Sequence, residues 1–71
     1  MIRHERELRL AEALSRLPDD YREVILLRNV ESLPHDAVAR RMERSVGAVR
    51  MLWLRALACL RQELEVLGTN Q

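Results

Sequence analysis

Arginine is the residue type with the clearest potential for binding chemistry in this chain. Residues 37–62 contain six arginines and a single acid, Glu43, so this segment carries a net charge of +5. Residues 1–36 contain six arginines and eight acids and carry −2, so the overall charge of +1 conceals a polarised molecule. Guanidinium groups suit phosphate, and a basic patch on helices is typical of nucleic-acid-binding surfaces. A solvated arginine face is the alternative that charge alone leaves open.

Other side chains give little support for catalysis or metal binding. His4 and His35 have no convincing partners, and Cys59 has no histidine nearby in the sequence. The chain has no lysine for covalent catalysis, no glycine-rich phosphate loop and no metal-ligand cluster. We therefore expect a domain that is not an enzyme and has no cofactor. A single cysteine cannot form an internal disulfide, and Cys59 is interpreted as a small side chain at the edge of the core.

Length and composition predict one small, all-α domain spanning residues 1–71. A hydrophobic content of 48% with 32% charged residues is typical of a folded chain, and the apolar spacing is helical throughout. No apolar run approaches the ~20 residues that cross a bilayer. The N-terminus is too charged for a secretory signal. We therefore expect a cytoplasmic protein that does not bind membranes.

The apolar pattern predicts four helices, near residues 2–16, 19–31, 34–42 and 45–65. The first carries a stripe that should pack on the second helix and on the far end of the fourth, formed by Leu10, Leu14 and Leu17. Pro18 ends the first helix. Asp20 and Glu23 have capping-box spacing at the start of the second, and Gly68 is expected to close the fourth.

The third and fourth helices together have the outline of a helix-turn-helix, residues 34–64. The apolar face of the fourth consists of Val49, Leu52, Trp53, Ala56 and Leu60. The chain breaks at Glu43-Arg44, and Ser45 is a suitable N-cap for the helix that follows. In such motifs the second helix enters the DNA major groove. The turn and cap therefore favour DNA binding over a solvated arginine face, whereas His35 is expected on the surface.

The chain also resembles a known family. The similarity runs from about Leu10 to Leu64 and rests on the motifs LPDDYREVILLRNVESLP, AVARRM, RSVGAVR and LRALACLR. These motifs resemble region 4, the C-terminal domain, of sigma-70-type factors, most of all the extracytoplasmic-function (ECF) group. The resemblance implies a four-helix domain of a bacterial transcription-initiation factor, which reads the −35 promoter element and touches the flap of the RNA polymerase β subunit. It also suggests an anti-sigma protein as a partner.

The resemblance assigns roles to individual residues. The expected DNA-binding set is Arg41, Arg44, Ser45, Val46, Gly47, Arg50, Met51, Leu54 and Arg55. Within this set Arg50 is the best candidate for a base edge, as a bidentate donor to guanine. Arg41, Arg44 and Arg55 would hold phosphates, which fixes register without reading sequence, and Arg40 is a further candidate.

The chain departs from the family pattern at several positions. Glu43 stands in the turn where the family often has glycine, and a left-handed residue other than glycine costs on the order of 1–2 kcal/mol. Pro34 stands where the family often has a capping hydroxyl. Apolar or weakly polar residues replace polar ones along the fourth helix at Met51, Leu54, Leu57 and Cys59. We expect the first helix to cover Leu57, whereas Leu54 stays exposed and contacts a thymine methyl or a protein: the polymerase flap, an anti-sigma protein or a second copy.

Two other function classes remain open from sequence. A helix-turn-helix regulator module of the response-regulator type would bind paired half-sites as a symmetric dimer, whereas region 4 binds one element as a monomer. A protein-interaction domain that has lost DNA binding would show no salt-dependent affinity for DNA. The chain has no counterpart of sigma region 2, so it is interpreted as either an excised domain or a stand-alone relative.

Overall fold

The computed structural model describes the backbone of residues 2–69 and the side chains of residues 6–68. The elements in chain order are α1 (Ile2–Ser15), α2 (Asp19–Ile25), a π-helical segment η1 (Leu26–Val30), α3 (His35–Met42) and α4 (Val46–Thr69). No strand occurs within the described backbone. The predicted all-α class with a four-helix architecture is confirmed, and the predicted bounds differ from those observed by a few residues at most.

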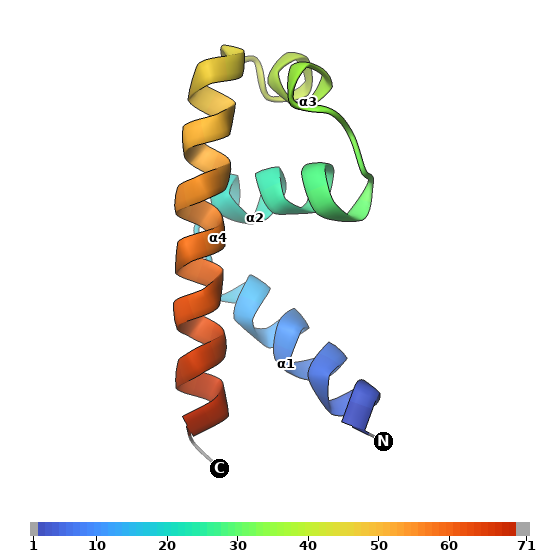
Figure 1. Ribbon diagram of the computed structural model, residues 1–71, viewed down its shortest axis with the longest axis vertical. Coiled ribbons are helices and arrows are strands. Elements are labelled where there is room, and N and C mark those ends of the chain that lie inside the picture. The colour runs from blue at the N-terminus through green and yellow to red at the C-terminus, as the bar shows by residue number, and fades with distance from the viewer. Residues whose placement is uncertain (1, 70–71) are drawn as a thin grey trace.

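Helix α4 is the element against which the other helices pack. In Figure 1 it forms one side of the molecule, with α1 beside its C-terminal half, α2 beside its middle and α3 beside its first turns. A helix of 24 residues is about 36 Å long. The longest dimension of the molecule is 40 Å, so the length of α4 sets the length of the domain.

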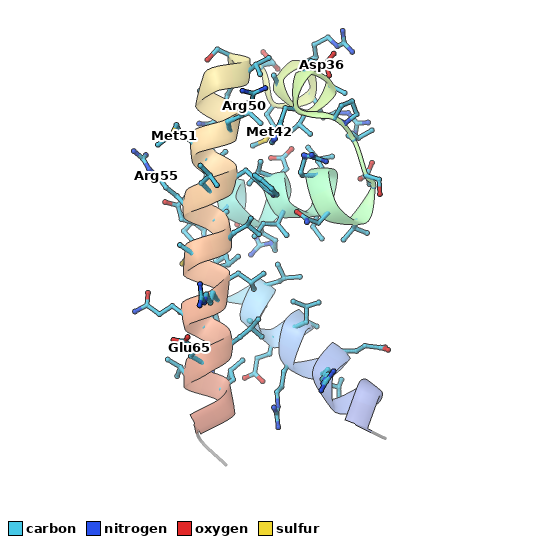
Figure 2. All side chains as sticks on the ribbon, in the orientation of Figure 1. Asp36, Met42, Arg50, Met51, Arg55 and Glu65 are labelled. Carbon is cyan, nitrogen blue, oxygen red and sulfur yellow. The ribbon has the colours of Figure 1, made fainter. Side chains whose placement is uncertain are left out.

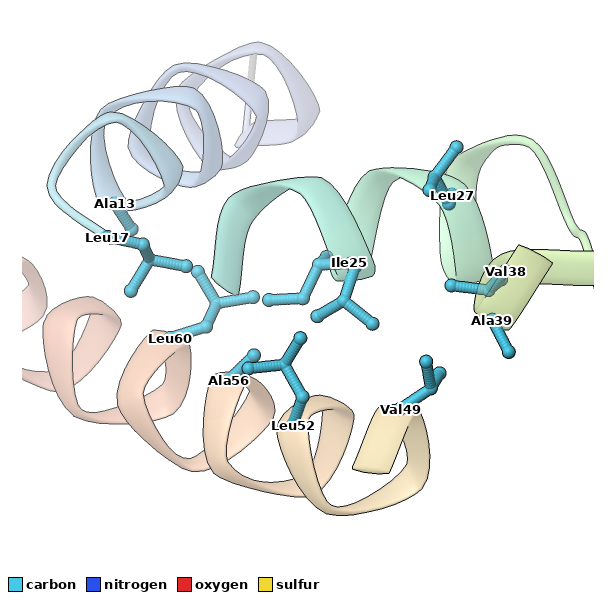
Figure 3. Packing of buried hydrophobic residues seen from close by; sticks show 11 residues of the cluster. Ala13, Leu17, Ile25, Leu27, Val38, Ala39, Val49, Leu52, Ala56 and Leu60 are labelled. Carbon is cyan, nitrogen blue, oxygen red and sulfur yellow. The ribbon is translucent and has the colours of Figure 1, made fainter. Parts of the chain in front are cut away.

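The core is a single row of aliphatic side chains along the inner face of α4 (Figure 3). Its fully enclosed valines come from three different helices: Val24, Val38 and Val49. The predicted inner face of α4 is confirmed by the burial of Val49, Leu52, Ala56 and Leu60, whereas Trp53 is half-buried at its edge. Burial of these side chains is the main favourable contribution to folding.

The turn between α3 and α4 has the backbone of a Schellman motif. Glu43 is left-handed, with φ 57° and ψ 48°. Its N–H donates to Arg40 O at 3.3 Å, and the N–H of Arg44 donates to Ala39 O at 2.9 Å. Ser45 then caps α4, because its Oγ accepts the N–H of Ala48 at 3.1 Å. The sequence predicted the break at Glu43-Arg44 and the N-cap at Ser45, and the family resemblance implied the left-handed residue in the turn.

The stripe predicted on α1 is correct for Leu14 and Leu17 but wrong for Leu10. Leu17 is buried and Leu14 packs against the core, whereas Leu10 is 42% exposed and Ala13 is fully buried in its place. Figure 1 shows the reason: α1 diverges from α4 toward its N-terminus, so the first turns of α1 have little to pack against.

Two predicted caps are also wrong. The capping box at Asp20 and Glu23 does not form, because Pro18 occupies the N-cap without a side-chain hydrogen bond and Asp20 therefore lies inside the first turn of α2. Gly68 does not end α4, which continues to Thr69. No glycine has positive φ in the described backbone, so Gly68 is an ordinary helical residue rather than a left-handed cap.

Replacement of the left-handed Glu43 by glycine should stabilise the domain. Glycine adopts this conformation without steric cost, so Glu43→Gly should raise the free energy of unfolding by about 1 kcal/mol in urea denaturation. The matched control is Glu31→Gly, because Glu31 is an exposed acid at a helix end with a right-handed backbone, φ −82°. That substitution should lower the free energy of unfolding. An equal decrease in the free energy of unfolding in both variants would contradict the proposed strain at Glu43.

Candidate nucleic-acid interface

All nine residues of the predicted DNA-binding set are exposed at one end of the molecule. Arg41 lies in the last turn of α3, Arg44 and Ser45 form the connection, and the others follow in the first turns of α4. Figure 2 shows Met51 and Arg55 projecting from the side of α4 that faces away from α2 and α3. The nine residues therefore surround the turn and the exposed sides of the first turns of α4, and none of them belongs to the core.

The arginines of this surface are largely unpaired. Within the described part of the chain, Arg41, Arg50 and Arg55 form no ion pair. Arg44 is the exception, because its Nη2 lies 3.5 Å from Oδ2 of Asp20 on α2. Both side chains of this pair are 42% exposed, and pairs of this kind contribute little in water. Arg44 is therefore free to exchange its carboxylate partner for another anion.

A polar cluster behind this surface joins η1, α3 and α4. The indole Nε1 of Trp53 donates to Oδ1 of Asn29 at 2.9 Å. The guanidinium of Arg28 lies over the Trp53 ring, 5.4 Å from its centroid, and donates to Leu33 O at 3.3 Å. His35 meets the same ring edge-on, with centroids 5.3 Å apart. These contacts fix how α4 is oriented relative to the two segments that precede it.

The placement of His35 on the surface was wrong, because its ring is half-buried in this cluster. Its Nε2 accepts a long hydrogen bond of 3.5 Å from Nε of Arg28, so the neutral ring carries its proton on Nδ1. That Nδ1 is buried and has no partner among the described residues. Burial, followed by the positive charges of Arg28 and Arg50, lowers the pKa of His35 below its ordinary value of 6.5.

Sequence reasoning missed the whole cluster, although one signal was available. Trp53 is the only tryptophan, and its indole N–H requires an acceptor wherever the ring is partly buried. His35 precedes it in the helix that the helix-turn-helix prediction already placed next to α4, whereas Asn29 lies outside the predicted motif, near the end of the second helix. What the sequence does not contain is the register of η1, which turns Arg28 and Asn29 toward α4.

The two short-linked helices, the Schellman turn and the exposed arginines define a helix-turn-helix domain of the nucleic-acid-binding kind. The sequence model of the sigma-70 region 4 family matches residues 7–60, so the chain belongs to that family. Region 4 is the domain that binds the −35 element in sigma factors. No curated protein and no solved structure matches the chain. In the described residues no helix is long and apolar enough to cross a membrane.

The environment of His35 predicts that the domain loses stability in mild acid. Because the pKa is lower in the folded state than in the unfolded chain, the contribution of neutral His35 is complete above pH 6.5. It is lost as the pH falls from that value through the lowered pKa. Free energies of unfolding in urea at about pH 7.5 and about pH 5.5 should therefore differ more for the wild type than for His35→Phe.

Phenylalanine is the matched replacement, because it keeps an aromatic ring beside Trp53 and does not titrate. The two proteins are otherwise identical in sequence, so the difference between their pH slopes reports on His35. Parallel slopes for the wild type and His35→Phe would contradict the prediction.

Proposed function

We propose that this domain recognises the −35 element of bacterial promoters and thereby directs RNA polymerase to initiate transcription, as part of a factor of the ECF group. The observation that carries the proposal is the family match over residues 7–60, which covers α2, η1, α3, the turn and the larger part of both α1 and α4. The exposed, unpaired arginines at the start of α4 support it, because such a surface suits the phosphates on either side of a major groove.

The proposed roles follow from the position of each side chain. Arg50 lies in the second turn of α4 and is assigned to a base edge, where its fork can bind the O6 and N7 of guanine. Arg41, Arg44 and Arg55 are assigned to phosphates. Arg44 would exchange its exposed contact with Asp20 for a phosphate when DNA binds.

The family relationship also suggests protein partners. We propose that the domain binds the RNA polymerase core through the flap of the β subunit, and that an anti-sigma protein binds and regulates it. We also propose that it acts in the cytoplasm without membrane attachment. A single module neutralises few phosphates, so its own affinity for DNA is expected to be weak. Attachment to polymerase would compensate by raising the effective concentration of the domain at the promoter.

Selection from a library of duplex DNA, followed by binding measurements at increasing salt, tests this proposal. We expect the domain to select one short element, to bind it as a monomer, and to lose affinity as salt rises. Binding to two symmetric half-sites as a dimer would favour the response-regulator type of module. Absence of any salt-dependent affinity, together with retained binding to core polymerase, would favour a protein-interaction domain.

Arginine substitutions should separate base reading from phosphate binding. Arg50→Ala should cost about 1–3 kcal/mol of binding free energy and relax the preference at one base pair. Arg41→Ala or Arg44→Ala should weaken binding to all sequences alike and reduce the salt dependence. The control is Arg61→Ala, because Arg61 lies about 16 Å further along α4 and pairs with Glu65. If Arg50→Ala left the sequence preference unchanged while binding persisted, the placement of the recognition helix would be wrong.

A further inference from the structure

Gly47 occupies a position where the fold of the domain does not require glycine. It lies in the first turn of α4 with an ordinary helical backbone, because no glycine has positive φ in the described residues. A Cβ built on Gly47 meets no atom within 4 Å. Alanine is the better helix former, so glycine at this exposed site is a disadvantage to the free domain. The absence of a side chain at Gly47 therefore indicates that another molecule approaches the backbone of α4 closely at this position.

Met51 and Leu54 continue the same strip of surface. They follow Gly47 by four and seven residues, which places all three about 140–200° around the helix from the buried Val49. Met51 is 50% exposed and Leu54 is 55% exposed, so neither contributes much to the core. Exposure of Leu54 agrees with the expectation from sequence. We call Gly47, Met51 and Leu54 the apolar strip.

The charges beside the apolar strip indicate what covers it. Arg50 and Arg55 lie on opposite flanks, about 100° and about 240° from Val49 on the same helical projection. Neither forms an ion pair within the described part of the chain. An apolar strip with one cation on each flank complements a duplex groove, whose edges are phosphates and whose major-groove floor carries one apolar group, the thymine C5-methyl.

We propose, building on the function proposed above, that the apolar strip lies on the floor of the major groove and selects T·A pairs. Gly47 lets the backbone of α4 approach the bases, and the side chains of Met51 and Leu54 pack against thymine methyl groups. The side chains of Met51 and Leu54 cannot donate a hydrogen bond, so this part of the site reads shape and methyl groups. The element would then combine a guanine read by Arg50 with adjacent thymines read by the strip.

Alanine substitutions at the two glycines test whether the backbone of α4 approaches DNA closely at Gly47. Gly47→Ala should raise the melting temperature by a few degrees while lowering affinity for the selected duplex about tenfold. Gly68→Ala is the matched control, since Gly68 is also helical and a Cβ there also meets no atom within 4 Å. It should not lower the melting temperature and should leave DNA affinity unchanged. Unchanged affinity in Gly47→Ala would overturn the close approach and with it the proposal.

Replacement of thymine by uracil tests the methyl contacts, because it removes only the C5-methyl. In the selected duplex, uracil at one or two positions should weaken wild-type binding severalfold. Leu54→Gln should bind the thymine and uracil duplexes equally, with a nearly unchanged melting temperature. Val30→Gln is the control, because Val30 is 69% exposed on η1, away from the strip, and should preserve the discrimination.

The outcomes separate the two proposals. Equal binding of thymine and uracil duplexes by the wild type, with Arg50→Ala still weakening binding, would overturn the apolar strip and leave promoter recognition intact. Absence of any DNA affinity would overturn both. Loss of polymerase or protein binding in Leu54→Gln, with thymine discrimination unchanged, would identify the strip as a protein-docking surface and overturn its assignment to DNA. A large drop in melting temperature for Leu54→Gln would place Leu54 in the core and would also overturn the proposal.

Discussion

The inner face of α4 is the constraint on which the rest of this structure depends. The chain has no phenylalanine, so its core consists of valine, leucine, isoleucine and alanine packed along that face. The same helix carries most of the residues assigned to DNA on its exposed side. The orientation of the outer face is therefore fixed by the burial of Val49, Leu52 and Ala56. One helix therefore provides both the main core face and the exposed face on which the proposed DNA contacts lie, in a chain of only 71 residues.

Aliphatic packing alone would leave the angles between the helices poorly determined, because burial of apolar area is non-directional. The polar cluster around Trp53 supplies directional contacts that fix these angles. Asn29 holds the indole from one side, Arg28 covers its face, and His35 meets its edge. These groups come from η1, α3 and α4, so together they set the position of the helix-turn-helix relative to α2. Neutral His35 suits this arrangement, since a protonated ring would present a donor and a charge to Arg28.

Local pattern was sufficient to predict most of the fold. Helical spacing, the proline at position 18, the N-cap at Ser45 and the turn at Glu43 are decided by residues close together in sequence, and all were predicted. Leu10 and His35 were placed wrongly because their burial depends on the angle at which distant helices cross. The same holds for the candidate site: sequence predicted which residues would be exposed on α4, but not the cluster that orients them, because η1 changes the register of the preceding helix.

The pair of Arg44 with Asp20 shows how an acid can sit beside a basic surface without opposing it. Asp20 lies in the first turn of α2, where a carboxylate interacts favourably with the helix dipole. Its Oδ1 also accepts the N–H of Tyr21 at 3.0 Å, so the acid has partners of its own. The contact with Arg44 is exposed and contributes little, so a phosphate can replace it at small cost. Asp20 thus lies beside Arg44 in the free domain, and their exposed contact leaves the guanidinium available to another anion.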